Sequence, residues 1–180
     1  MTSDNAPVST PATPDELFAR LTALGLDVTT HHHAAVFTVE EAGALRGNLP
    51  GAHCKSLFLR DKKGAQFLVV CLEDRRIDMK ALAAIIGAGR LSFGSPERLM
   101  AALGVTPGSV TPFATINDQG AAAVSVVLDA EMMAAPLVNY HPLINTMTTS
   151  LTPDDLMRFL GDTGHQPRIT DLGPATRPPG

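Results

Sequence analysis

The chain is poor in cysteine and has no long apolar run. Its 180 residues include two cysteines, Cys54 and Cys71, which are seventeen positions apart and form no CxxC pair. This pattern fits neither a disulfide framework nor a zinc site, so we expect two small buried apolar residues in a reducing compartment. No stretch approaches the roughly 20 apolar residues that span a bilayer, and residues 1–16 lack the parts of a signal peptide. We therefore expect a cytoplasmic protein with no membrane partner.

An excess of positive charge and the common catalytic motifs are also missing. Fourteen Lys and Arg residues against eighteen Asp and Glu residues give a formal net charge of -4, which excludes a protein that coats nucleic acid indiscriminately. The patterns GxGxxG, GxxxxGK[ST], GxSxG and HExxH do not occur. Their absence excludes the common nucleotide-binding loops, the nucleophile elbow of α/β-hydrolases and the helical zinc-binding motif of metalloproteases. We expect no cofactor.

Composition divides the chain into one domain and two tails. Residues 1–13 are rich in Ser, Thr, Pro and Asn, and residues 173–180 are dominated by Gly and Pro, so we expect flexible ends. Residues 14–172 have the length of a single domain. Hydrophobic residues make up 44% of the chain, which is enough to form a folded core.

Helix and strand signals interleave along the predicted domain. The expected helices cover residues 14–24, 38–45, 78–87, 95–103 and 152–161. Four of them begin next to a Thr or Ser that can cap the first turn, and Thr38 with Glu41 forms a capping box. The expected strands cover residues 56–60, 65–72 and 122–128, with shorter ones around residues 137, 147 and 169. The first two form a hairpin, so the sequence predicts an α/β fold with a mixed sheet and helices packed against it.

Histidines 31–33 form the most conspicuous polar cluster. Neighbouring residues on a strand point to opposite faces, so at most His31 and His33 could share a metal ion. No carboxylate or cysteine lies at a spacing from these histidines that is typical of a metal site. We therefore expect a solvated strand or loop and no metal site.

Three other features can carry chemistry. Residues 103–113 place Pro107, Gly108 and Pro112 in a loop whose composition fixes the backbone and leaves amides unpaired, although it also fits an ordinary connector. His141 precedes a proline that favours extended geometry, but a lone histidine is more often structural. Lys55 stands at the entrance of an apolar strand, where its ammonium either reaches solvent or points into a cleft toward a phosphate or carbonyl oxygen.

Four segments, in a consistent order and spacing, resemble the YbaK/ProX group of aminoacyl-tRNA editing domains. They are residues 53–64 (HCKSLFLRDKKG), 90–99 (RLSFGSPERL), 103–113 (LGVTPGSVTPF) and 141–146 (HPLINT). Within this group they are most similar to the ProXp-ala subfamily of free-standing Ala-tRNA(Pro) deacylases. The resemblance extends from about Leu17 to Ile169. It implies an α/β domain whose mixed, largely antiparallel, barrel-like sheet is surrounded by helices.

The resemblance implies a trans-editing hydrolase that cuts the ester between a misattached alanine and the 3' end of tRNA(Pro). Prolyl-tRNA synthetase cannot sterically exclude alanine, which is smaller than proline. A difference of about one methylene group changes the free energy of discrimination by only about 1 to 3 kcal/mol, so a second pocket that is too small for proline can remove the error. Two alternatives stay open: the same fold editing Cys-tRNA(Pro) or a Ser or Thr ester, and a non-catalytic nucleic-acid-binding module. The implied partners are the acceptor end of mischarged tRNA(Pro) and, transiently, prolyl-tRNA synthetase or elongation factor.

Individual roles follow from the same resemblance. Lys55 matches an essential lysine that holds the 3' end of the substrate, and His141 matches a histidine of the pocket. The GxxxP loop, whose backbone grips the aminoacyl group, corresponds to Gly108, Ser109, Val110, Thr111 and Pro112. Ser56 stands where the family often has Asn, which puts in doubt any hydrogen bond that the Asn side-chain amide makes in the family. The family mechanism uses the ribose 2'-hydroxyl to help activate water, with the oxyanion stabilised by loop amides and Lys55.

The basic residues are concentrated in one part of the chain. Residues 46–98 contain ten of the fourteen Lys and Arg residues against five Asp and Glu residues. Arg90, in the matched segment RLSF, is a candidate for contacting the tRNA acceptor end, and Arg60, Lys62 and Lys63 are expected to join it. The sequence therefore predicts one local basic face on an acidic protein.

Overall fold

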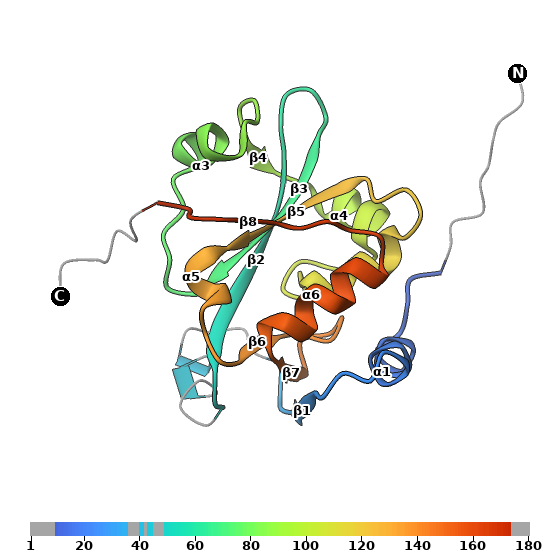
Figure 1. The fold of residues 1–180 in the computed structure, drawn as a ribbon. Helices are drawn as coiled ribbons and strands as arrows, with labels where there is room; N and C mark the ends of the chain where they lie inside the picture. Colours follow the sequence, from blue (N-terminus) through green and yellow to red (C-terminus); the bar gives the residue numbers. More distant parts are fainter. Residues whose placement is uncertain (1–9, 36–39, 42, 45–48, 174–180) are drawn as a thin grey trace, which may run out of the picture.

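The fold of the chain is a mixed sheet with helices on both of its faces (Figure 1). The computed structural model describes residues 10–35, 40–41, 43–44 and 49–173. The described strands are β1 (Thr29–His32), β2 (Ala52–Arg60), β3 (Gln66–Leu72), β4 (Ser92–Phe93), β5 (Val124–Asp129), β6 (Val138–Tyr140), β7 (Met147–Leu151) and β8 (Arg168–Thr170). The described helices are α1 (Pro14–Ala23), α3 (Met79–Ile86), α4 (Pro96–Leu103), α5 (Ala130–Met133), α6 (Pro153–Asp162) and the 3-10 helix η1 (Pro112–Asp118).

The strands pair in the order β1-β7-β6-β2-β3-β5-β8, and β4 also pairs with β2. Among these described strands, four pairs are antiparallel and three are parallel. The long strand β2 pairs with β3 along most of its length, with β6 at its start and with β4 at its end. The predicted mixed α/β fold and the predicted hairpin are both confirmed.

Successive residues of the central strands serve two separate cores. Phe58 and Val70 belong to the larger core, which also contains the buried faces of α1, α4 and α6. Leu59 and Val69 belong to a smaller core that α3 covers. Because side chains alternate along a strand, the α3 side and the opposite side of the sheet present different residues of β2. Figure 1 shows β2 and β3 between α3 on one side and α4 and α6 on the other.

The predicted helix starts are confirmed where the structure describes them. Thr13 and Glu16 form a capping box at α1, with the Thr13 hydroxyl accepting from the Glu16 amide at 3.2 Å and the Glu16 carboxylate from the Thr13 amide at 3.2 Å. The Ser95 and Thr152 hydroxyls cap α4 and α6 by accepting from the amides of Arg98 and Asp155, each at 3.2 Å. Thr38 and Leu45, which bound the second expected helix, lie outside the described residues; the described residues 40–41 and 43–44 are helical.

Four features differ from the predictions or add to them. Strand β2 begins at Ala52, so Lys55 lies inside the strand and not at its entrance. Strand β4 and the short helices α5 and η1 carry too few residues to show a periodic pattern. The Ala12 amide donates to Asn117 Oδ1 at 2.8 Å, so contacts with the domain begin before residue 14. Residues 1–9 and 174–180 of the expected tails lie outside the described residues. None of the described helices has the length and apolar character to cross a bilayer.

Candidate functional site

Lys55 lies on the α3 side of the sheet and is held by a main-chain oxygen. It is in register with Cys71 on β3 and on the same strand face as Leu57 and Leu59, which pack into the smaller core. Its ammonium donates a hydrogen bond to the backbone carbonyl of Arg75, in the turn that follows β3. An ammonium has three N–H donors, and this bond uses one of them.

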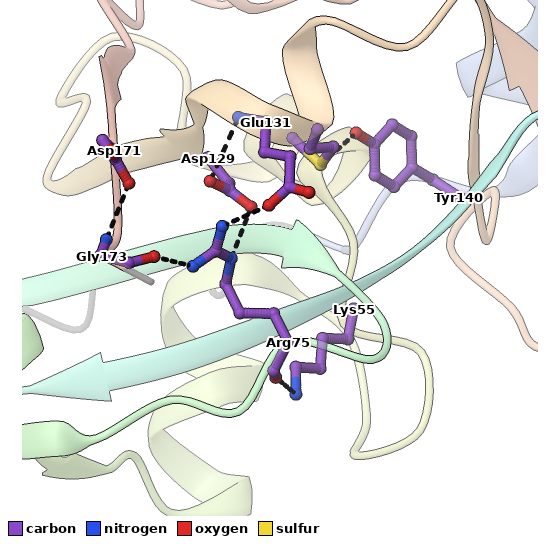
Figure 2. A network of polar contacts seen from close by, with 8 residues as sticks. Lys55, Arg75, Asp129, Glu131, Tyr140, Asp171 and Gly173 are labelled. Atoms are coloured by element: carbon purple, nitrogen blue, oxygen red, sulfur yellow. Dashed lines mark hydrogen bonds and ion pairs between the residues drawn. The ribbon is translucent and has the colours of Figure 1, made fainter. Parts of the chain in front are cut away.

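Arg75 is almost completely buried, with 3% of its side chain exposed. Its Nε donates to Asp129 Oδ2 at 2.8 Å, its Nη2 to Glu131 Oε2 at 2.7 Å and its Nη1 to the Gly173 carbonyl at 2.5 Å. Figure 2 shows the Arg75 side chain pointing toward these partners and its carbonyl oxygen toward Lys55. Sequence reasoning missed this group, because nothing in the local pattern links residues 75, 129 and 131.

The thiols near Lys55 are not nucleophiles. Burial raises the pKa of Cys71 to about 11, although the positive charge of Lys55 acts in the opposite direction. Burial likewise raises the pKa of Cys54 to about 12. A thiol with such a pKa stays protonated at neutral pH and is inert. Cys71 is buried, as expected, whereas Cys54 is only half-buried.

His141 is a neutral imidazole with a defined tautomer. Its Nδ1 lies 2.9 Å from the carbonyl oxygen of Met147, and a carbonyl only accepts, so Nδ1 carries the proton and Nε2 is an acceptor. Burial lowers the pKa of His141 below its ordinary value of 6.5, the bond to Met147 raises it in part, and the neighbouring His33 lowers it further. The ring is therefore uncharged at pH 7.

His33 is a neighbour of His141 that sequence reasoning did not find. The two ring centroids are 6.2 Å apart, and His33 Nε2 lies 2.8 Å from the Thr148 hydroxyl. His31 and His32 belong to β1, but His33 packs toward the site, so the expectation of a wholly solvated run is wrong for this residue. Nothing local in HHH shows the contact, because it depends on the pairing of β1 with β7. Within the described part of the chain, no three His, Cys, Asp or Glu side chains are grouped to hold a metal ion.

The loop of residues 108–112 lies beside the segment that follows His141. Gly108 has a φ of +89°, and a Cβ there would lie 3.9 Å from Asn145 Nδ2. The Ser109 amide donates to the Thr106 carbonyl at 3.0 Å, so one amide of the predicted gripping loop is already used. Thr111 and Pro112 are buried and begin η1, with the Thr111 hydroxyl accepting from the Phe113 amide at 3.3 Å. Val110 packs against the larger core.

The predicted substrate residues do not all meet in the structure. Ser56 follows Lys55 on β2 and therefore faces the opposite side of the sheet, toward the larger core. Among the described residues, no hydrogen bond joins Lys55 to His141 or to residues 108–112. The structure thus brings the 108–112 loop next to the 141–146 segment, and it anchors Lys55 separately, through the turn after β3.

Three of the four predicted tRNA-binding residues line one surface hollow. This hollow has a volume of about 390 Å³ and is formed by Arg60, Asp61, Lys62, Arg90 and Ser92. The buried Asp61 accepts hydrogen bonds from the amides of residues 63, 65 and 89, which ties the hairpin turn to the segment before β4. Lys63 is exposed on the hairpin turn. Arg60, which lines the hollow, lies five positions after Lys55 on β2, a distance of about 17 Å along the strand.

Comparisons with known proteins identify the family of the chain. Residues 33–159 match the aminoacyl-tRNA editing domain family. The chain is 39% identical over 158 residues to "Prolyl-tRNA synthetase associated domain-containing protein 1" of Bos taurus, covering 85% of this chain and 91% of that protein. It is 36% identical over 157 residues to "Prolyl-tRNA editing protein ProX" of Acetoanaerobium sticklandii, covering 87% and 95%.

The fold is shared with solved structures as well. A crystal structure of a protein proposed to be a trans-editing enzyme for prolyl tRNA synthetase superposes with a TM-score of 0.64 at 22% identity, covering 89% of this chain and 96% of the other. At that identity the likeness concerns the fold. The family assignment instead depends on the match that spans most of the domain and on relatives above 30% identity, and on these grounds the chain belongs to the aminoacyl-tRNA editing domain family.

Proposed function

We propose that the chain is a deacylase that hydrolyses the ester of mischarged Ala-tRNA(Pro). The observation that carries the proposal is the anchored ammonium of Lys55, which bonds to the Arg75 carbonyl and has two further N–H donors with no partner among the described residues. A fixed positive donor of this kind binds a phosphate or carbonyl oxygen at the 3' end of the substrate. The relatives named as prolyl-tRNA editing and prolyl-tRNA synthetase associated proteins support proline tRNA as the acceptor.

Hydrolysis requires an activated water and a stabilised oxyanion. The Nε2 of neutral His141 can accept a hydrogen bond from the attacking water or from the ribose 2'-hydroxyl. Negative charge then develops on the former carbonyl oxygen, and Lys55 is the stabilising donor that we propose for it. For the amides of the 108–112 loop, which lies apart from Lys55, we propose that they hold the aminoacyl group. Ser109 contributes less than its position suggests, since its amide is already bonded to Thr106.

The hollow of Arg60, Lys62 and Arg90 is the docking site that we propose for the tRNA backbone. Beside it, Phe93 of β4 is 65% exposed and pairs with Leu59. Exposed aromatic rings next to basic residues bind single strands by base stacking, which is worth about 1 to 3 kcal/mol per base. The single-stranded acceptor end can then extend along β2 from the hollow toward Lys55.

We also propose a transient association with prolyl-tRNA synthetase or elongation factor. The support is the name of the relatives as synthetase-associated proteins and the separation between the tRNA hollow and the lysine, which leaves much of the tRNA to another partner. Mischarged tRNA is released by the synthetase, so an enzyme that acts in trans gains from meeting it there.

The proposal is tested by a deacylation panel with Ala-, Pro-, Ser- and Cys-tRNA(Pro). We expect rapid hydrolysis of Ala-tRNA(Pro) alone. Rapid hydrolysis of the Cys or Ser ester with inert Ala-tRNA(Pro) would redirect the assignment to that substrate, and inertness toward all four would refute a deacylase.

The same panel is run with Lys55→Ala. Because the change removes one fixed donor to the oxyanion, we expect kcat to fall about 10² to 10³-fold, with an unchanged circular dichroism spectrum. Lys80→Ala, which removes an exposed lysine of α3, is the matched control and keeps its activity. Wild-type turnover by a folded Lys55→Ala protein would contradict the role of Lys55.

A further inference from the structure

We infer that Arg75 is a positioning residue, whose buried side chain fixes the carbonyl that holds the Lys55 ammonium. This inference rests on the proposed function, in which Lys55 binds the 3' end of the substrate. Two separate parts of Arg75 act: the guanidinium binds Asp129, Glu131 and the Gly173 carbonyl, and the main-chain oxygen accepts from Lys55.

The turn that carries Arg75 is tied to both strands of the hairpin. The Arg75 amide donates to the Leu72 carbonyl at 3.1 Å, and the Glu73 amide donates to the His53 carbonyl at 2.9 Å. His53 lies on β2 two residues before Lys55. The turn therefore sits directly beside the strand face from which Lys55 projects, and a shift of the turn moves the carbonyl relative to the ammonium.

The Arg75 side chain prevents that shift by joining the turn to two distant segments. Asp129 is completely buried and ends β5, and its other oxygen accepts from the Glu131 amide at 3.3 Å to cap α5. Gly173 follows β8, and its amide donates to Asp171 Oδ1 at 2.8 Å. A buried guanidinium must keep its partners, because an unpaired charge in the interior is strongly unfavourable. The turn is thereby held from three sides (Figure 2).

The consequence concerns where the ammonium of Lys55 lies. Lysine carries its charge on a flexible four-carbon stem, so a single fixed acceptor decides which of its rotamers is occupied. Catalysis is sensitive to such placement, since a displacement of about 1 Å can cost about 10²-fold in rate. Arg75 and the partners of its guanidinium, Asp129, Glu131 and Gly173, form the Arg75 network. This network affects the reaction through Lys55 and does not itself contact the substrate.

The test compares two buried carboxylates with the same substitution. Asp129→Asn removes the charge that binds Arg75. Asp118→Asn removes another buried carboxylate, which accepts from His165 Nε2 and the Val124 amide, each at 2.9 Å. Among the described residues, Asp118 makes no hydrogen bond to Arg75 or to the partners of its guanidinium. We expect kcat/KM for Ala-tRNA(Pro) to fall 10- to 100-fold in Asp129→Asn. Asp118→Asn keeps wild-type kcat/KM at a similar loss of Tm.

A second measurement reports on Lys55 without any substrate. Proton–nitrogen NMR spectra of ¹⁵N-labelled protein detect lysine ammonium groups, and the Lys55 signal is assigned by its loss in Lys55→Ala. We expect this signal to shift or broaden in Asp129→Asn and to stay unchanged in Asp118→Asn. If Lys55→Ala proves active, the role of Lys55 in the proposed function fails, whereas the NMR comparison still decides whether the network positions the ammonium.

Glu131→Gln serves if Asp129→Asn does not fold. The Glu131 side chain is 56% exposed, so its loss of charge is tolerated, and we expect the same NMR change together with a few-fold lower kcat/KM. An unchanged Lys55 signal and wild-type kcat/KM in whichever of the two variants folds would overturn the inference.

Discussion

At the scale of single residues, main-chain oxygens set the state of the two candidate catalytic side chains. The Met147 carbonyl selects the tautomer of His141, and the Arg75 carbonyl holds the ammonium of Lys55. The two positions differ in how their side chains matter. The Arg75 side chain is bound to Asp129, Glu131 and the Gly173 carbonyl and so fixes the place of its own carbonyl, whereas the part of Met147 that contacts His141 is its main-chain oxygen.

The lowered pKa of His141 predicts a pH dependence of stability. Because the folded protein binds this proton more weakly than the unfolded chain does, the unfolded state takes up more protons below pH 6.5. The stability of the native state is thus complete above that value and decreases as the pH falls toward the folded pKa. We expect urea unfolding to show a larger loss from pH 7.5 to 5.5 in the wild type than in His141→Gln.

The neighbours of His141 define the control for this measurement. His33 and Glu73 also act on the His141 ring, so His33→Gln is measured beside it. An identical loss of stability in the wild type and in His141→Gln would show that the imidazole of His141 does not contribute.

At the scale of elements, the connection from α4 to η1 shapes the 108–112 loop. Gly104 ends α4 with a φ of +65°. Asn117 of η1 bridges this end to the chain before α1, since its Nδ2 donates to the Leu103 carbonyl at 2.9 Å and its Oδ1 accepts from the Ala12 amide at 2.8 Å. One amide side chain thus holds together three segments around the start of the loop.

We expect Gly104→Ala to destabilise the protein more than Gly87→Ala. Both glycines end a helix in the left-handed region, which costs other residues about 1 to 2 kcal/mol. A Cβ at Gly104 would also lie 2.6 Å from Asn117 Nδ2, whereas one at Gly87 meets nothing within 4 Å. Thermal unfolding measures the difference. Equal losses of Tm would mean that the Asn117 side chain moves away from the added Cβ with no loss of stability.

Whether a feature could be predicted from the sequence depends on how far apart in the chain its interacting residues lie. Helix starts at Thr13, Ser95 and Thr152 were predictable, because a cap and its helix are a few residues apart. The hairpin was predictable for the same reason. The contact of His33 with Thr148 and the Arg75–Asp129 pair were not, because each joins strands whose pairing no local pattern specifies. Lys55 and the 103–113 loop were singled out by position and composition, and the resemblance to a family assigned their roles. The contacts of Arg75 that anchor Lys55 were not predicted.

At the scale of the whole molecule, charge is distributed unevenly. The formal net charge is -4, yet Arg60, Lys62 and Arg90 converge on one hollow at the end of β2. An acidic protein repels nucleic acid in general, and the function proposed above assigns a single phosphate-rich end to this local basic hollow. Affinity of this kind is weak and depends on salt.

The double variant Arg60→Ala/Arg90→Ala tests the basic hollow. Each lost contact with a single-stranded phosphate lowers the slope of log affinity against log salt by about 0.7, so we expect a slope smaller by about 1.4. Fluorescence anisotropy with a labelled acceptor-stem RNA measures it. Lys80→Ala/Arg158→Ala removes the same charge from α3 and α6 as a control. Equal slopes in the two double variants would place the tRNA elsewhere.

The strand pairing also determines which parts of the site can form first while the chain is being synthesised. The β2–β3 hairpin, with Lys55 and the Arg75 turn, needs only residues up to about 75 and can form early. Strand β1 pairs with β7, and Arg75 binds Asp129 and Gly173, so these contacts wait for most of the chain. Contacts between distant residues form slowly. Lys55 is thus in its strand from an early stage, and the anchor that orients it is completed last.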